Sequence, residues 1–177
     1  MSLIMQKRMN SSTLYAAQGA VTAALYVSLT LLSQMLGLTS LAVQIRFSEA
    51  LCVLPFFGFA AVPGLTIGCV LANLLLGSAP WDVVFGSLAT LLGALACYYV
   101  SSALKKRGRG TLALVLSPIP NILSNTLILP FIIKWVYFDE MSMGLLFLFV
   151  FLGEAASCLP GIPLAYALRK RIPQLFK

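Results

Sequence analysis

The sequence has no histidine and very few charged residues. Only 10% of its 177 residues are charged, whereas soluble domains average about 25%. So few charges cannot cover a surface that faces water, which excludes an ordinary water-soluble enzyme and a disordered protein. The chain also lacks a Walker-type phosphate loop and a nucleophile elbow, and without histidine it has no His-based catalytic triad. We therefore expect a protein that is not an enzyme.

Cysteine and basic residues are present in patterns that exclude further classes. The four cysteines lie inside apolar stretches, and no two form a CxxC pair: Cys52, Cys69, Cys97 and Cys158. We expect them to be small packing residues, with no metal site and no cofactor. The net charge is +7, but the basic residues lie at the ends of apolar blocks, so nucleic acid is not an expected partner.

What the sequence has in abundance is apolar residues, which make up 60% of the chain at a mean hydropathy of +0.96. One helical membrane crossing needs about 20 residues. We predict an all-α, integral membrane bundle in a single domain, residues 1–177, with six transmembrane segments. These run over Thr13–Leu36, Phe47–Phe59, Val62–Leu76, Trp81–Leu104, Thr111–Ile133 and Met143–Leu168. The second and third are short, so one broken helix and five spans is the alternative.

The distribution of basic residues favours six segments. Ten of them then fall on one side: Lys7, Arg8, Lys105, Lys106, Arg107, Arg109, Arg169, Lys170, Arg171 and Lys177. The positive-inside rule makes this side cytoplasmic, which places both termini in the cytoplasm of a multi-pass protein. The first segment is then a retained helix rather than a signal peptide. Trp81, Trp135 and Tyr137 fall at the outer interface, where an aromatic belt is the simplest interpretation.

An acidic residue deep in the membrane is the strongest sign of a functional site. Glu154 lies eleven residues into the sixth segment, which corresponds to about 16 Å of helix and places it near the midplane. A carboxylate at that depth must be protonated, paired or solvated in a cavity. A structural pair with Arg46 is the alternative to a binding role.

Two further groups of polar residues are candidates for the same site. Arg46 and Glu49 are three residues apart, so they share a helix face at the outer mouth of the bundle, although Ser48 and Glu49 also fit a capped helix start. The amides Asn121 and Asn125 have i, i+4 spacing, and amides can bridge helices or hydrogen-bond the edge of a heterocyclic base. Asn73 and Asp82 complete the set, and for Asp82 a role at a helix N-terminus is the alternative.

Small residues recur along one face of the first segment. Ala16, Ala20 and Ala24 are four residues apart, with Gly19 and Ala23 beside them. Such a face lets another helix approach closely. It serves either internal packing or docking of another membrane protein.

Five stretches carry a resemblance to the QueT family, substrate-binding S-components of energy-coupling factor (ECF) transporters for queuosine precursors. They are VQIRFSEALCVLPFF (43–57), PGLTIGCVLANLL (63–75), WDVVFGSLATL (81–91), PNILSNTLI (120–128) and LGE (152–154). The stretch 134–142 shows no family pattern. The resemblance implies an importer subunit in a prokaryotic plasma membrane that captures its ligand from outside. It also implies docking, through Ala16, Ala20 and Ala24, onto a transmembrane coupling subunit bound to two cytoplasmic ATPases.

The resemblance further implies a ligand of the 7-deazaguanine type, such as preQ1 or queuine. Glu49 and Glu154 would bind its guanine-like edge and its amine, in an order that the sequence leaves open, and Asn125 would bind another ring edge. Phe47, Trp135 or Tyr137 would stack on the ring. The alternatives are another vitamin-like heterocycle, a standalone secondary transporter or channel, and a structural membrane protein.

Overall fold

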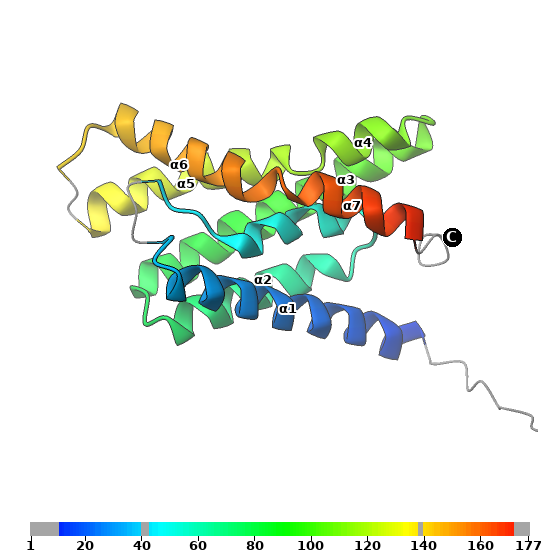
Figure 1. The fold of residues 1–177 in the computed structure, drawn as a ribbon, viewed down its shortest axis with the longest axis horizontal. Coiled ribbons are helices and arrows are strands. Elements are labelled where there is room, and N and C mark those ends of the chain that lie inside the picture. Colours follow the sequence, from blue (N-terminus) through cyan, green and yellow to red (C-terminus); the bar gives the residue numbers. More distant parts are fainter. Residues whose placement is uncertain (1–10, 40–42, 138–139, 172–177) are drawn as a thin grey trace, which may run out of the picture.

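The computed structural model describes residues 11–39, 43–137 and 140–171, and the regular secondary structure within them is entirely helical. The elements are α1 (Ser11–Met35), η1 (Phe47–Phe56), α2 (Ala61–Leu75), η2 (Asp82–Gly86), α3 (Ser87–Lys106), α4 (Gly110–Leu116), α5 (Ile119–Val136), α6 (Met143–Cys158) and α7 (Gly161–Arg171). They pack side by side as an elongated bundle (Figure 1). The predicted all-helical membrane fold is confirmed.

In the described part of the chain, four helical stretches are long and apolar enough to cross a membrane: Ser12–Met35, Asp82–Lys106, Gly110–Val136 and Met143–Arg171. The second and third predicted segments correspond to the shorter apolar helices η1 and α2. The chain reverses direction between them (Figure 1). They are therefore two separate elements rather than one broken helix, which agrees with the six-segment prediction.

The η1 element explains how a short segment can reach far across the bundle. It is a 3-10 helix of 10 residues. A 3-10 helix rises about 2.0 Å per residue against about 1.5 Å for an α-helix, so η1 spans roughly 20 Å instead of roughly 15 Å. The expectation that Ser48 caps this helix is wrong. Arg46 is the residue before the first turn, and Ser48 lies within the helix with its buried hydroxyl unpaired.

The predicted fifth and sixth segments are each divided in two, which the sequence analysis did not anticipate. The fifth consists of α4 and α5, separated at Ser117 and Pro118, and the sixth consists of α6 and α7, separated at Leu159 and Pro160. Proline lacks the N–H that would continue the helical hydrogen bonds. The side-chain hydroxyl of Ser117 donates to the Leu114 carbonyl at 2.7 Å and so satisfies an acceptor beside the break.

Glycines bring α1 and α2 into direct backbone contact. A Cβ atom on Gly64 would lie 2.7 Å from the Gly19 carbonyl oxygen, and one on Gly68 would lie 2.7 Å from the Tyr26 Cβ. Of the small residues on α1, Gly19 and Ala23 therefore serve internal packing. Each glycine allows a close approach that a larger residue would prevent.

The two ends of the bundle differ in charge. The start of α1, the turn between α3 and α4, and the end of α7 lie at one end (Figure 1). This end carries all the described members of the predicted cytoplasmic basic set, from Lys105 to Arg109 and from Arg169 to Arg171. Lys7, Arg8 and Lys177 lie outside the described residues. Here Lys105 Nζ donates to the Phe56 carbonyl and lies 3.9 Å from the centre of the Phe56 ring, so it caps the end of η1.

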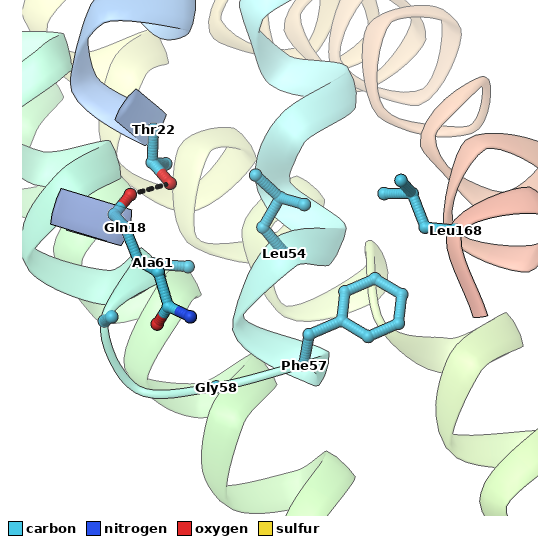
Figure 2. Close-up of a pocket in the computed structure, with 8 residues that line it drawn as sticks. Gln18, Thr22, Leu54, Phe57, Gly58, Ala61 and Leu168 are labelled. Carbon is cyan, nitrogen blue, oxygen red and sulfur yellow. Dashed lines mark hydrogen bonds between the residues drawn. The ribbon is translucent and has the colours of Figure 1, made fainter. Parts of the chain in front are cut away.

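A small cavity lies near this basic end, between α1, η1 and α7. Figure 2 shows its lining, in which Leu54 and Phe57 face Leu168 across the opening. Its volume is about 180 Å³, and Gln18 and Thr22 supply its polar side chains. None of the described residues that line it has a titratable side chain. The polar interior of the bundle lies elsewhere, around Glu49 of η1.

Candidate ligand-binding site

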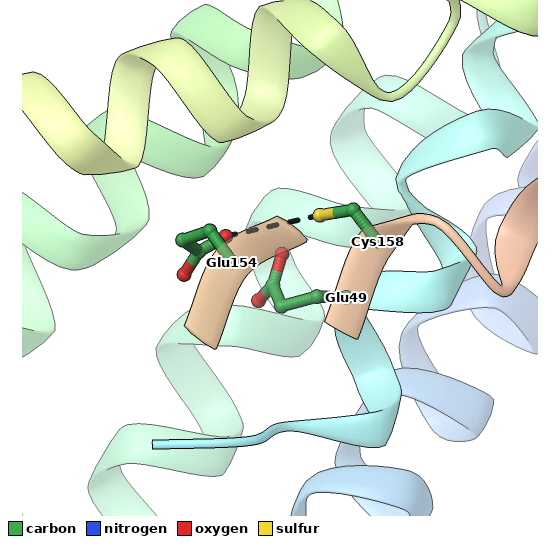
Figure 3. A group of neighbouring side chains, drawn as sticks. All are labelled: Glu49, Glu154 and Cys158. Atoms are coloured by element: carbon green, nitrogen blue, oxygen red, sulfur yellow. Dashed lines mark hydrogen bonds between the residues drawn. The ribbon is translucent and has the colours of Figure 1, made fainter. Parts of the chain in front are cut away.

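Four polar side chains from three elements meet in the interior of the bundle. Glu49 comes from η1, Asn121 and Asn125 come from α5, and Glu154 comes from α6. Glu49, Asn121 and Asn125 are only 4%, 1% and 3% exposed, and Glu154 is half-buried. A carboxylate oxygen of Glu49, one of Glu154 and the Cys158 sulfur lie within 4.8 Å of one another (Figure 3). We call Glu49 and Glu154 the carboxylate pair.

One face of α5 holds both members of the carboxylate pair. Asn121 Nδ2 donates to Glu49 Oε2 at 2.8 Å, and Asn125 Nδ2 donates to Glu154 Oε2 at 2.9 Å. The i, i+4 spacing predicted that these amides share a face, and the structure places both against a carboxylate. Gly93 on α3 allows the approach, because a Cβ there would lie 2.6 Å from Asn121 Oδ1.

Tyr26 on α1 completes the surroundings of Glu49. Its hydroxyl donates to Glu49 Oε1, and the side chain is 1% exposed. Both oxygens of Glu49 thus accept hydrogen bonds from the protein, whereas within the described residues Glu154 Oε1 accepts none. The sequence analysis missed Tyr26, since a tyrosine in an apolar helix carries no signal of its own.

The carboxylate pair favours a positively charged ligand. Two unit charges within 4.8 Å of each other repel by at least about 3 kcal/mol at an effective dielectric constant near 20. Arg46 lies within electrostatic range of both carboxylates. Two carboxylates and one guanidinium leave a formal charge of −1 when all are ionised. A monocation would neutralise that charge.

A second, polar cavity lies beside this cluster, towards the end of the bundle opposite the basic end (Figure 1), and we call it the outer cavity. Its volume is about 380 Å³, and its polar lining is Gln34, Thr39, Gln44, Arg46, Ser78, Asp82 and Tyr137. Leu129 and Ile133 also line it, and they continue along α5 at the same i, i+4 spacing as Asn121 and Asn125. One stripe of α5 therefore runs from the carboxylate pair to the outer cavity, and Arg46 lies beside both.

Asp82 and Tyr137 form the outer wall of this cavity. The Tyr137 hydroxyl donates to Asp82 Oδ2, and burial together with this carboxylate raises the pKa of Tyr137. Asn73, by contrast, is 2% exposed and donates to the Asp82 carbonyl at 3.4 Å. It links α2 to η2 and does not line the outer cavity.

Two of the three predicted stacking residues do not line the outer cavity. Trp135 is 68% exposed and packs on Phe131 with ring centres 5.3 Å apart. Phe47 is 37% exposed, and its backbone N–H donates to Ser33 Oγ at 2.8 Å. Neither lines the outer cavity, so Tyr137 is the predicted stacking residue that the structure places there.

The same cluster could offer a metal ion at most three of its acidic and thiol groups: Glu49, Glu154 and Cys158. Structural zinc sites use four ligands, supplied by cysteine and histidine. Here amide N–H groups already occupy one oxygen of each carboxylate. The arrangement fits a ligand that donates hydrogen bonds better than it fits a metal ion.

An apolar groove runs along the outside of α1 and α2. Its volume is about 840 Å³, and Ala16, Ala20 and Ala24 line it and are exposed. Gly19 is half-buried and Ala23 is buried against α2. Both also line the groove, so all five small residues of the predicted face lie along it, and Gly19 and Ala23 pack against α2 as well.

A membrane bundle that encloses acidic and amide groups beneath an outer polar cavity defines a multi-pass transport protein of the cell membrane. The family model for the QueT transporter matches residues 16–170, so the chain belongs to the QueT transporter family. Over 74 residues it is 39% identical to the queuosine precursor transporter QueT of Lactococcus lactis subsp. cremoris (strain MG1363). That match covers 41% of this chain and 43% of the relative, less than half of either. No solved structure matches the chain.

Proposed function

We propose that this chain is the substrate-capture subunit of an ECF-type importer. It binds a queuosine precursor from outside, as a cationic 7-deazaguanine such as preQ1 or queuine. A coupling subunit and two cytoplasmic ATPases then drive delivery inward. Membership of the QueT family supports this proposal. The observation that carries it is the carboxylate pair held by two amides below the outer cavity.

The chemistry of such a ligand matches the donors and acceptors of the cluster. A guanine-like edge presents an N–H and an amino group side by side, and a carboxylate can accept from both. Glu154 has an oxygen that accepts no hydrogen bond from the described part of the chain, so we assign it the direct contact with the ligand. Glu49 is occupied on both oxygens and contributes its charge to the cationic arm.

The groove on α1 and α2 supports the coupling part of the proposal. Its three exposed alanines would let a helix of the coupling subunit approach the α1 backbone closely. Association in lipid depends on such packing, because lipid tails are as apolar as the helix surface. This chain then needs no nucleotide site of its own.

The test compares a charged ligand with an uncharged one of the same shape. Calorimetry on the purified chain should show tight binding of the aminomethyl deazaguanine and at least about tenfold weaker binding of its cyano analogue. Equal affinity for both would contradict a site built for a cation. Mass spectrometry of the molecule that copurifies with the chain should show a deazaguanine, and another heterocycle there would change the substrate class.

A standalone secondary transporter is the competing function, favoured by the half-buried Glu154 within a membrane segment. Uptake into proteoliposomes that contain this chain alone, without ATPases, would support it. Uptake that appears only when the coupling subunit, the ATPases and ATP are added would support the importer.

A further inference from the structure

We infer that Tyr26 is a positioning residue that couples the docking groove on α1 to the ligand site. The inference rests on the proposed function, since it requires a ligand at the carboxylate pair and a partner in the groove. It concerns a residue that touches neither of them. Tyr26 would act through Glu49.

Tyr26 is the contact of α1 with the carboxylate pair. Its hydroxyl donates to Glu49 Oε1 from a helix that otherwise packs on α2 and η1. The side chain is 1% exposed, so water cannot replace the bond when it breaks. A hydrogen bond to a charged group in such surroundings weakens steeply with distance and angle.

The same turn of α1 faces the groove on its other side. Ala23, Ala24 and Val27 line the groove, and they are within three residues of Tyr26. Across the helix contact, a Cβ atom on Gly68 would lie 2.7 Å from the Tyr26 Cβ. A partner helix seated in the groove therefore contacts the turn that carries Tyr26, and a shift of that turn also alters its close contact with α2.

A shift of this turn changes the ligand site directly. When α1 moves on docking, the Tyr26 hydroxyl leaves Glu49 and one of its two protein hydrogen bonds is lost. Glu49 is then free to move away from Glu154, and the paired geometry that holds the cation is lost. Docking thereby lowers the ligand affinity at the moment when the ligand must leave towards the cytoplasm.

The decisive variant is Tyr26→Phe, which removes the hydroxyl and keeps the ring. Affinity for aminomethyl deazaguanine is measured by calorimetry on the isolated chain and on its complex with the coupling subunit and ATPases. We expect the wild type to bind at least about tenfold more weakly in the complex. In Tyr26→Phe the isolated chain should lose about tenfold in affinity, and the ratio between the two states should fall to about one.

The matched control is Tyr98→Phe, which removes a hydroxyl from a partly buried tyrosine packed on the same apolar cluster. It should keep the wild-type affinity and the wild-type ratio. A Tyr26→Phe chain that unfolds at a lower temperature but keeps the wild-type ratio would overturn the inference, because Tyr26 would then be structural only.

A second measurement avoids the loss of the hydroxyl. Fluorotyrosine placed at position 26 should give a fluorine resonance that shifts when the chain binds the coupling subunit. The resonance should not shift when the coupling subunit carries a substitution that prevents docking. An unmoved resonance in the docked complex would also overturn the inference. A wild-type chain that binds no deazaguanine, or forms no complex, would instead contradict the proposed function itself.

Discussion

Replacing Glu154 by Gln tests the direct ligand contact, because it removes the charge and keeps the shape. The glutamine side-chain oxygen can still accept the hydrogen bond from Asn125 Nδ2, which is 2.9 Å long in the structure. What is lost is a charge-assisted bond to the cationic ligand, worth about 2 kcal/mol. This corresponds to an affinity about thirtyfold weaker.

The same substitution should leave the fold intact or stabilise it. Removal of one charge relieves the repulsion between two carboxylates whose oxygens lie within 4.8 Å, which amounts to about 3 kcal/mol when both are ionised. Calorimetry gives the affinity, and thermal unfolding in detergent gives the stability. Glu140→Gln, at an exposed acid outside the site, is the matched control. Wild-type affinity in a folded Glu154→Gln chain would refute the assignment of Glu154.

Three further substitutions separate docking, site geometry and the membrane interface. Ala20→Leu should abolish copurification with the coupling subunit and leave ligand affinity unchanged, whereas Ala96→Leu, at an exposed position of α3, should leave both unchanged. Gly153→Ala should lower both the ligand affinity and the unfolding temperature, because its Cβ would overlap the Gln44 carbonyl. Trp135→Leu should leave ligand affinity within a factor of about two, since the ring lies outside the cavity, and a larger loss would restore Trp135 as a stacking residue.

The sequence could predict the site residues whose placement in a membrane is costly. Glu154 is recognisable because an acid in the middle of an apolar run requires a partner or a cavity. Asn121 and Asn125 are recognisable because two amides at i, i+4 spacing lie on one helix face. That both amides hydrogen-bond the carboxylate pair could not be predicted, because this depends on where η1 packs and hydropathy alone does not define its position.

The breaks within the fifth and sixth segments could not be predicted from proline alone. Pro118 and Pro160 lie at breaks, but Pro63 lies within α2 and Pro130 within α5. Proline near a helix start loses no hydrogen bond, and proline in a membrane helix is tolerated where neighbouring groups satisfy the freed carbonyl. Tertiary packing therefore decides which proline ends a helix, and this packing cannot be predicted from the local sequence around each proline.

Glycine contacts explain why the carboxylate pair forms at this depth. Gly153 and Gly161 lie on either side of Glu154 along α6 and α7. A Cβ on Gly153 would overlap the Gln44 carbonyl, just before η1, and a Cβ on Gly161 would overlap the Ala50 carbonyl, within η1. The backbone of η1 therefore rests directly on these helices, with Glu49 between the two contacts. The separation of Glu49 from Glu154 is thus set by packing of main chain against main chain. Such a contact holds two acids together more rigidly than flexible side chains could, and it leaves Tyr26 as the hydroxyl through which α1 reaches the pair.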